Sequence, residues 1–166
     1  MSRHVIRIVV ERGDARCLVS IRKRLSTRLS KRSEMSLLSH VFIGINDFDR
    51  AFGFYSKLMT DLGLVLKFSE PEKPWAGWMQ SDAPRPLLII GQPYDRGVAS
   101  PGNGQMVALL AKDRATVDRC FATAIANGSR SEGPPGLRPE YHPNYYGAYF
   151  RDPEGNKLCV CCHEPA

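Results

Sequence analysis

Residues 39–47 read Ser39-His40-Val41-Phe42-Ile43-Gly44-Ile45-Asn46-Asp47. Val41, Ile43 and Ile45 alternate with the other residues, which is the period-two pattern of a strand with one buried face. The pair 46–47 then supplies a helix cap, and apolar residues recur every three or four positions as far as Gly63. That spacing predicts an amphipathic helix that ends at the glycine. The segment 39–63 is therefore predicted to be a β-α unit.

Three further strand-like runs follow this unit, at 64–68, 76–80 and 87–91. Pro71 and Pro74 separate the first two runs, and a turn at 81–84 separates the last two. The first half of the chain is therefore predicted to have the order βαβββ.

The second half repeats the pattern of the first. A short apolar strand at 105–111 precedes a helical spacing that stops at 127–128. Equivalent positions in the two halves are Met106 and His40, Asp113 and Asp47, Gly147 and Gly77, and Asp152 and Asp82. The repeat predicts an α+β fold of tandem βαβββ modules, at about 37–94 and 104–163, whose curved sheet encloses a cleft. The glycines and prolines of 133–143 predict a weak second strand in the second module, followed by a long loop.

Cysteine usage and hydropathy restrict the class of protein. The five cysteines are an odd number, and no apolar segment of a secretory signal precedes them, so a disulfide framework is not expected. The expected location is the cytoplasm. No apolar run approaches the length of a membrane span, and no membrane partner is expected.

The charge is concentrated at the N-terminus. Of the 166 residues, 1–34 carry ten Lys and Arg against three acids, so they account for the net charge of +6. The remainder is close to neutral, which argues against nucleic acid as a partner. The basic arm is open to three interpretations: a targeting or anionic-surface arm, an extra packed element, or a disordered tail upstream of a physiological start at Met35. We favour the third, with one domain at 35–166.

Two motifs resemble the vicinal oxygen chelate superfamily, which includes glyoxalase I, bleomycin-resistance proteins and extradiol dioxygenases. One is the strand 39–45 followed by Asp47 and the aromatic helix segment 51–55. The other is Asp152-Pro153-Glu154-Gly155-Asn156 before the last strand, where Asp caps a turn, Pro fixes φ and Gly adopts the left-handed conformation. The resemblance covers about 37–163 and implies the fold more strongly than the function.

The resemblance also implies where a metal would bind. Members that use a metal take ligands from the first and last strands of each module. His40 matches this pattern, Met106 departs from it, and Cys159 stands where Glu is usual. The segment 87–92 offers no His or carboxylate. The expected ligands of a divalent Zn, Ni, Mn or Fe ion are therefore His40 and Cys159, and the resemblance further implies a homodimer.

The loop 141–149 is dense in aromatic and hydrogen-bonding groups. His142 is the candidate catalytic base, with Tyr145, Tyr146 and Tyr149 as walls of a substrate site. The alternative is an aromatic-packed loop with an exposed histidine.

Two other groups of residues have structural as well as functional interpretations. Trp75 and Trp78 are candidates to line the same substrate site, although they also suit the core or a dimer interface. The run 159–163 holds three cysteines and a histidine, but strand alternation places only Cys159, Cys161 and His163 on one face. We therefore interpret its cysteines as small buried hydrophobic residues.

Two functions follow from these observations. The first is a glyoxalase-like enzyme acting on a small molecule with vicinal oxygens, by metal-assisted chemistry of the lactoylglutathione lyase or dioxygenase type. The second is a non-enzymatic binder of a planar small molecule, similar to bleomycin-resistance proteins, with a degenerate metal site.

Overall fold

The computed structural model describes residues 37–166, so the basic arm lies outside the described residues. The first half of the described chain forms β1 (His40–Gly44), α2 (Phe48–Asp61), β2 (Val65–Glu70), β3 (Trp75–Met79) and β4 (Leu87–Gly91). The second half forms β5 (Val107–Leu110), α3 (Arg114–Ala126), β6 (Arg130–Leu137), β7 (Tyr146–Arg151) and β8 (Lys157–Cys162). We call these halves module 1 and module 2.

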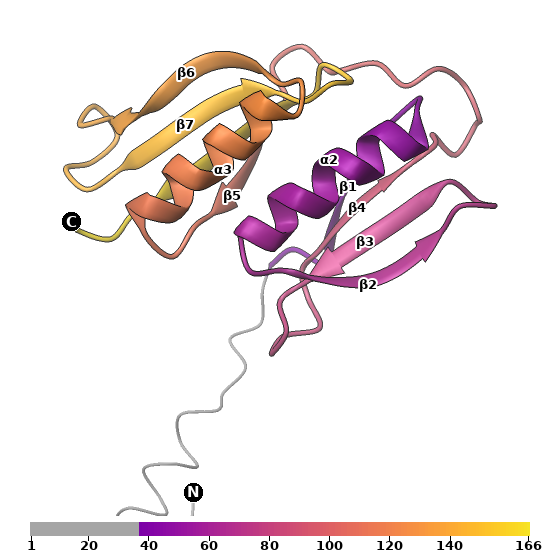
Figure 1. Ribbon diagram of the computed structural model, residues 1–166, viewed down its shortest axis with the longest axis horizontal. Helices are drawn as coiled ribbons and strands as arrows, with labels where there is room; N and C mark the ends of the chain where they lie inside the picture. The colour runs from indigo at the N-terminus through magenta and orange to yellow at the C-terminus, as the bar shows by residue number, and fades with distance from the viewer. Residues whose placement is uncertain (1–36) are drawn as a thin grey trace, which may run out of the picture. The chain divides into compact units, whose positions relative to one another are not determined.

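Each module is a four-stranded mixed sheet with one helix packed on it (Figure 1). The strand orders are β1-β4-β3-β2 and β5-β8-β7-β6, and in both sheets only the first pair is parallel. This arrangement confirms the predicted α+β fold of tandem βαβββ modules. The two sheets share no hydrogen-bonded strands, and they do not close into a barrel.

Both helices begin in the same way, as the repeat predicts. The Asp47 side chain accepts a hydrogen bond from the backbone N–H of Arg50 at 3.0 Å, and Asp113 accepts one from Thr116 at 2.7 Å. These caps satisfy donors that the first helical turn leaves unpaired. None of the described helices is long and apolar enough to cross a membrane.

The glycines and prolines of 133–143 predict a weak second strand and a long loop in module 2. The structure has an irregular strand there, β6, that extends to Leu137, and the loop that follows covers 138–145. The register of β6 on β7 shifts between Ser131 and Gly133 and again between Gly133 and Gly136. These irregularities accommodate Pro134 and Pro135, which cannot donate to the ladder.

The core lies between each helix and its sheet. Tyr55, Leu58 and Met59 of α2 are fully buried, as are Val117 and Cys120 of α3. The helices also contact each other: Lys57 Nζ donates to Asn127 Oδ1 at 2.6 Å, and Thr123 Oγ1 donates to Asp61 Oδ2 at 2.5 Å. Each sheet has one face covered by its own helix. The other face carries no helix of its module, and we call it the open face of that sheet.

Candidate functional site

The open face of module 2 gathers the chemically active side chains. Strand alternation along β8 puts Leu158 and Val160 into the core against α3 and turns Cys159 and Cys161 to the opposite side. Tyr149 of β7 is the cross-strand partner of Cys159 and therefore shares its face. Two thiols and a phenol are thus placed side by side by β-sheet register alone.

Two tyrosine hydroxyls form a short chain with one of these thiols. The Tyr149 hydroxyl donates to the Tyr145 oxygen at 3.3 Å, and the Tyr145 oxygen lies 3.6 Å from Cys159 Sγ. Burial, followed by the hydrogen bond with Tyr149, raises the pKa of Tyr145. The hydrogen bond with Cys161, followed by burial, raises the pKa of Cys159. The Tyr145 hydroxyl and the Cys159 thiol therefore stay protonated at neutral pH and can donate hydrogen bonds.

A pair of histidines borders the same face. His142 Nε2 lies 2.6 Å from His163 Nδ1, and the two rings stack with centroids 4.9 Å apart. His163 Nε2 in turn lies 3.8 Å from Cys161 Sγ. His142 was predicted as a catalytic base from the composition of its loop, whereas His163 was given no role. Strand alternation did predict that His163 shares the face of Cys159 and Cys161, but nothing in the sequence pairs it with His142.

Tyr146 and Trp78 lie on the helix side of their sheets and not on the open faces. Trp78 therefore has the core position that was the alternative to its place in the substrate site, whereas Tyr146 had been a candidate wall only. The Tyr146 hydroxyl donates to Asp118 Oδ1 of α3 at 2.8 Å, and Trp78 is buried with its ring stacked on Phe52 at 5.9 Å. Alternation explains the difference, because each is next to a residue that does reach the open face. Of the predicted walls in module 2, Tyr145 and Tyr149 remain.

The open face of module 1 is mainly apolar. Trp75 lies against Phe68, with ring centroids 4.7 Å apart, and a Cβ placed on Gly77 would be 2.6 Å from the Phe68 ring. Phe42 covers Gly91 in the same manner. His40 is exposed at the start of β1, with its Nδ1 3.3 Å from Ser39 Oγ. This face offers aromatic surface and one accessible imidazole.

The predicted metal ligands belong to different sheets of the chain. His40 is on β1 of module 1, and Cys159 is on β8 of module 2, where it hydrogen-bonds to Tyr145. A divalent-metal centre requires three or four protein donors. Within residues 37–166, no group of three or more His, Cys, Asp and Glu side chains is arranged to hold a metal. The donors of one chain therefore do not fit such a centre, and we assign Cys159 a hydrogen-bonding role.

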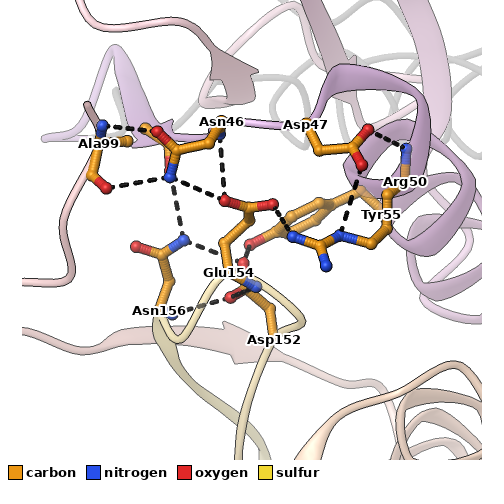
Figure 2. Close-up of polar contacts among 9 residues, drawn as sticks. Asn46, Asp47, Arg50, Tyr55, Ala99, Asp152, Glu154 and Asn156 are labelled. Atoms are coloured by element: carbon orange, nitrogen blue, oxygen red, sulfur yellow. Dashed lines mark hydrogen bonds and ion pairs between the residues drawn. The ribbon is translucent and has the colours of Figure 1, made fainter. Parts of the chain in front are cut away.

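The turn 152–156 links the modules (Figure 2). Asp152 is only 4% exposed; its Oδ2 accepts from the Tyr55 hydroxyl at 2.6 Å, and its Oδ1 accepts from the backbone N–H of Asn156 at 2.8 Å. Glu154 pairs with Arg50 and accepts from the backbone and side chain of Asn46 at 3.1 and 3.0 Å. The motif therefore joins β8 to the start of α2, and its role is structural.

Comparison with known proteins agrees with this geometry. Residues 37–160 match the family model of the Glyoxalase/Bleomycin resistance protein/Dioxygenase superfamily. The chain belongs to this superfamily. A search among curated proteins finds no match.

Solved structures of the glyoxalase/bleomycin resistance/dioxygenase superfamily resemble this member closely. A glyoxalase/bleomycin resistance protein from Albidiferax ferrireducens is 33% identical, with a TM-score of 0.67 over 76% of this chain and 99% of that one. A glyoxalase-related enzyme from Fulvimarina pelagi is 19% identical, with a TM-score of 0.58 over 77% and 88%. A superfamily enzyme from Burkholderia phytofirmans is also 19% identical, with a TM-score of 0.58 over 78% and 100%. The last two show the fold alone.

Proposed function

We propose that this superfamily member binds a small planar molecule with vicinal oxygens on the open face of module 2. The observation that carries the proposal is the pair of tyrosine hydroxyls, 3.3 Å apart, on Tyr145 and Tyr149. Because Tyr149 donates its proton to Tyr145, the two oxygens offer acceptor lone pairs side by side, where two neighbouring hydroxyls of a ligand could donate to them. The partly buried rings provide aromatic surface for a planar ligand.

The binding mode does not require a metal held by one chain. Within residues 37–166 no group of three or more His, Cys, Asp and Glu side chains is arranged to hold a metal, and Cys159 already pairs with Tyr145. Binding through tyrosine hydroxyls is therefore the function that these residues support best. This corresponds to a small-molecule binder rather than a metal-assisted lyase.

We further propose that a second copy of the chain covers the open faces. Phe42 of module 1 and Met106 and Leu110 of module 2 are exposed apolar side chains on or beside these faces, and Leu110 is 70% exposed. Exposed apolar surface of this kind is typical of an interface. Light scattering should then report a homodimer, and Leu110→Glu should shift it to monomer. A wild-type monomer at micromolar concentration would contradict the dimer.

The binding proposal is tested with three isomeric or related phenols. Catechol carries vicinal oxygens, hydroquinone carries the same oxygens on opposite sides of the ring, and phenol carries one. We expect chelator-treated protein to bind catechol at least about fivefold more tightly than either control, because only catechol engages both hydroxyls. Ligand-observed NMR titration measures the three affinities.

Elemental analysis separates this proposal from the metalloenzyme alternative. Purified protein that has not met a chelator is compared with His40→Ala at known concentration. The binding proposal expects catechol affinity to be equal in both proteins. It is overturned if the wild type holds about one metal per chain or per dimer, if His40→Ala loses it, and if catechol binding disappears with it.

A further inference from the structure

The sulfur of Cys161 lies beside a histidine that follows its own strand. His163 Nε2 approaches it at 3.8 Å, and Cys159 and Tyr145 lie on the same face of the sheet. These groups come from β8, from the residue just after it and from the residue preceding β7. A sulfur that accepts a hydrogen bond from an imidazole N–H is favoured as the thiolate, which is the nucleophilic form of cysteine.

The tautomer of His163 follows from its neighbours. The backbone N–H of Asn144 donates to His142 Nδ1 at 3.2 Å, so that nitrogen carries no proton. A neutral His142 is then protonated at Nε2, which donates to His163 Nδ1 at 2.6 Å. His163 must therefore carry its own proton on Nε2, the nitrogen that faces Cys161. The histidine pair thus fixes a donor on the sulfur and leaves no basic nitrogen there.

Cys161 is also the most accessible of the four described cysteines. It is 5% exposed, whereas Cys120, Cys159 and Cys162 are 0% exposed. All four are free thiols. All four are buried, and Cys161 keeps the largest exposed fraction among them, so it is the best placed of these cysteines to meet a ligand.

We propose that Cys161 is a nucleophile that captures an α,β-unsaturated carbonyl compound on the open face of module 2. This deepens the proposed function and rests on it, because the electrophile would bind where Tyr145 and Tyr149 hold vicinal oxygens. The sulfur forms a bond to the β-carbon, and the carbon–carbon π bond breaks. Its electron pair moves to the carbonyl as an enolate, and the proton lost by the thiol returns to the α-carbon. The product is a thioether, and no oxidant or reductant is needed.

The electrostatics of the cluster agree with this role. The hydrogen bond from Cys159, opposed by burial and aided by Tyr145 and His163, lowers the pKa of Cys161 to about 6. The pKa of Cys159 is shifted in the opposite direction by the same contact. One strand therefore carries one activated thiol and one thiol held protonated to support it.

The test is site-resolved labelling of the full-length chain with N-ethylmaleimide, a soluble α,β-unsaturated carbonyl compound. Peptide mass spectrometry follows each cysteine separately, in the native protein and in protein unfolded in guanidinium at the same pH. We expect native Cys161 to react at least about tenfold faster than Cys120, Cys159 and Cys162, and faster than Cys161 in the unfolded chain. An inert buried cysteine would instead react more slowly when folded, and that result overturns the proposal.

Matched variants identify the responsible groups. Cys161→Ala should abolish the fast phase, whereas Cys162→Ala, one residue further along β8 but facing the core, should retain it. His163→Leu should slow labelling by about tenfold, and His163→Gln, which restores an N–H donor, should recover part of the rate. Equal rates in both His163 variants and the wild type would remove His163 from the mechanism as a positioning residue.

Failure of this inference is distinguishable from failure of the proposed function. Catechol is not an electrophile, so its titration on the wild-type protein reports binding alone. Slow labelling of Cys161 with intact catechol binding overturns only the nucleophile. Absence of catechol binding overturns the proposed function whatever the labelling rate.

Discussion

Gly77 and Gly147 are equivalent positions in the two modules, and an aromatic ring lies over each. In module 1 the ring is Phe68, and in module 2 it is Tyr145; a Cβ on either glycine would come within 2.6 and 2.8 Å of the ring. The absence of a side chain lets the ring approach the sheet in both cases. The two rings come from different places, because Phe68 lies on the neighbouring strand β2, whereas Tyr145 directly precedes β7 and has Trp75 as its equivalent in module 1.

The ring over the glycine also sets the chemistry of each face. Phe68 packs against Trp75, so module 1 presents apolar surface. Tyr145 hydrogen-bonds to Tyr149 and Cys159, so module 2 presents a polar network on a buried sheet face. Duplication has therefore kept the scaffold while the polar groups are gathered in one copy. This is why we place ligand recognition in module 2.

The turns before the last strands differ in a similar way. Asp82 in module 1 is exposed, whereas its equivalent Asp152 in module 2 is buried and bonded to Tyr55. One copy of the turn remains a surface feature, and the other joins the modules. Equivalent positions in a repeat can therefore contribute differently to the free energy of unfolding, because the contribution depends on burial and on hydrogen-bond partners.

The largest effect is therefore expected from Asp152→Ala. It leaves the Tyr55 hydroxyl and the amide of Asn156 without their acceptor in a buried site, which costs about 3–5 kcal/mol of the free energy of unfolding. Asp82→Ala, the matched control, should change stability by less than about 0.5 kcal/mol. Guanidinium denaturation measures both. Equal losses in the two variants would contradict a special role of the buried turn.

The sequence predicted the fold well because its signals can be found without tertiary contacts. Alternation in 39–45, helical spacing up to Gly63 and the internal repeat together specify two βαβββ modules, and the structure confirms them. The turn motif at 152–156 was correctly placed before the last strand. Its role as a link between modules was not predicted, because Tyr55 and Arg50 are distant in sequence, and only tertiary packing brings them to it.

The site was predicted only in part. Alternation could have separated Tyr145 from Tyr146, but the exact start of β7 was needed to assign the faces, and strand ends are difficult to place from sequence. The composition of the loop identified His142 but not His163, which approaches it from the end of β8. The prediction of His40 and Cys159 as ligands relied on resemblance, and the described residues add no third donor to this pair.

The second prediction uses the two covered glycines. Gly77→Ala and Gly147→Ala should each destabilise the protein by about 1–2 kcal/mol, because the added methyl group displaces the ring above it. Only Gly147→Ala should also weaken catechol binding, since it moves Tyr145. Thermal denaturation and NMR titration provide the two readouts. Equal loss of catechol affinity in Gly77→Ala would place the ligand on module 1 as well.

The third prediction compares adjacent tyrosines on opposite sides of one sheet. Tyr145→Phe removes the hydroxyl that faces Tyr149, and catechol affinity should fall about five- to tenfold. Tyr146→Phe removes a hydroxyl that faces Asp118 on the helix side, and catechol affinity should not change. If both variants bind catechol like the wild type, recognition does not use the tyrosine hydroxyls.

The smallest effect concerns the pH dependence of the link between modules. Burial raises the pKa of Glu154, but hydrogen bonds from Arg50 and Asn46 outweigh it and lower the pKa below its usual range. A carboxyl whose pKa is lowered on folding contributes stability above its unfolded pKa, near 4.3, and loses that contribution as pH falls through the folded pKa. Glu154→Gln should therefore cost about 1 kcal/mol at pH 7, a modest value because Arg50 is exposed.

The difference between wild type and Glu154→Gln should then shrink as the pH is lowered below about 4.5. Denaturation curves at several pH values measure it, with Glu140→Gln in the exposed 138–145 loop as a control that should stay within about 0.5 kcal/mol. A difference that persists unchanged at pH 3 would mean that Glu154 acts through shape rather than charge. The charge of Glu154 would then add nothing to the link between the modules. The contrast between the two turns would rest on Asp152 alone.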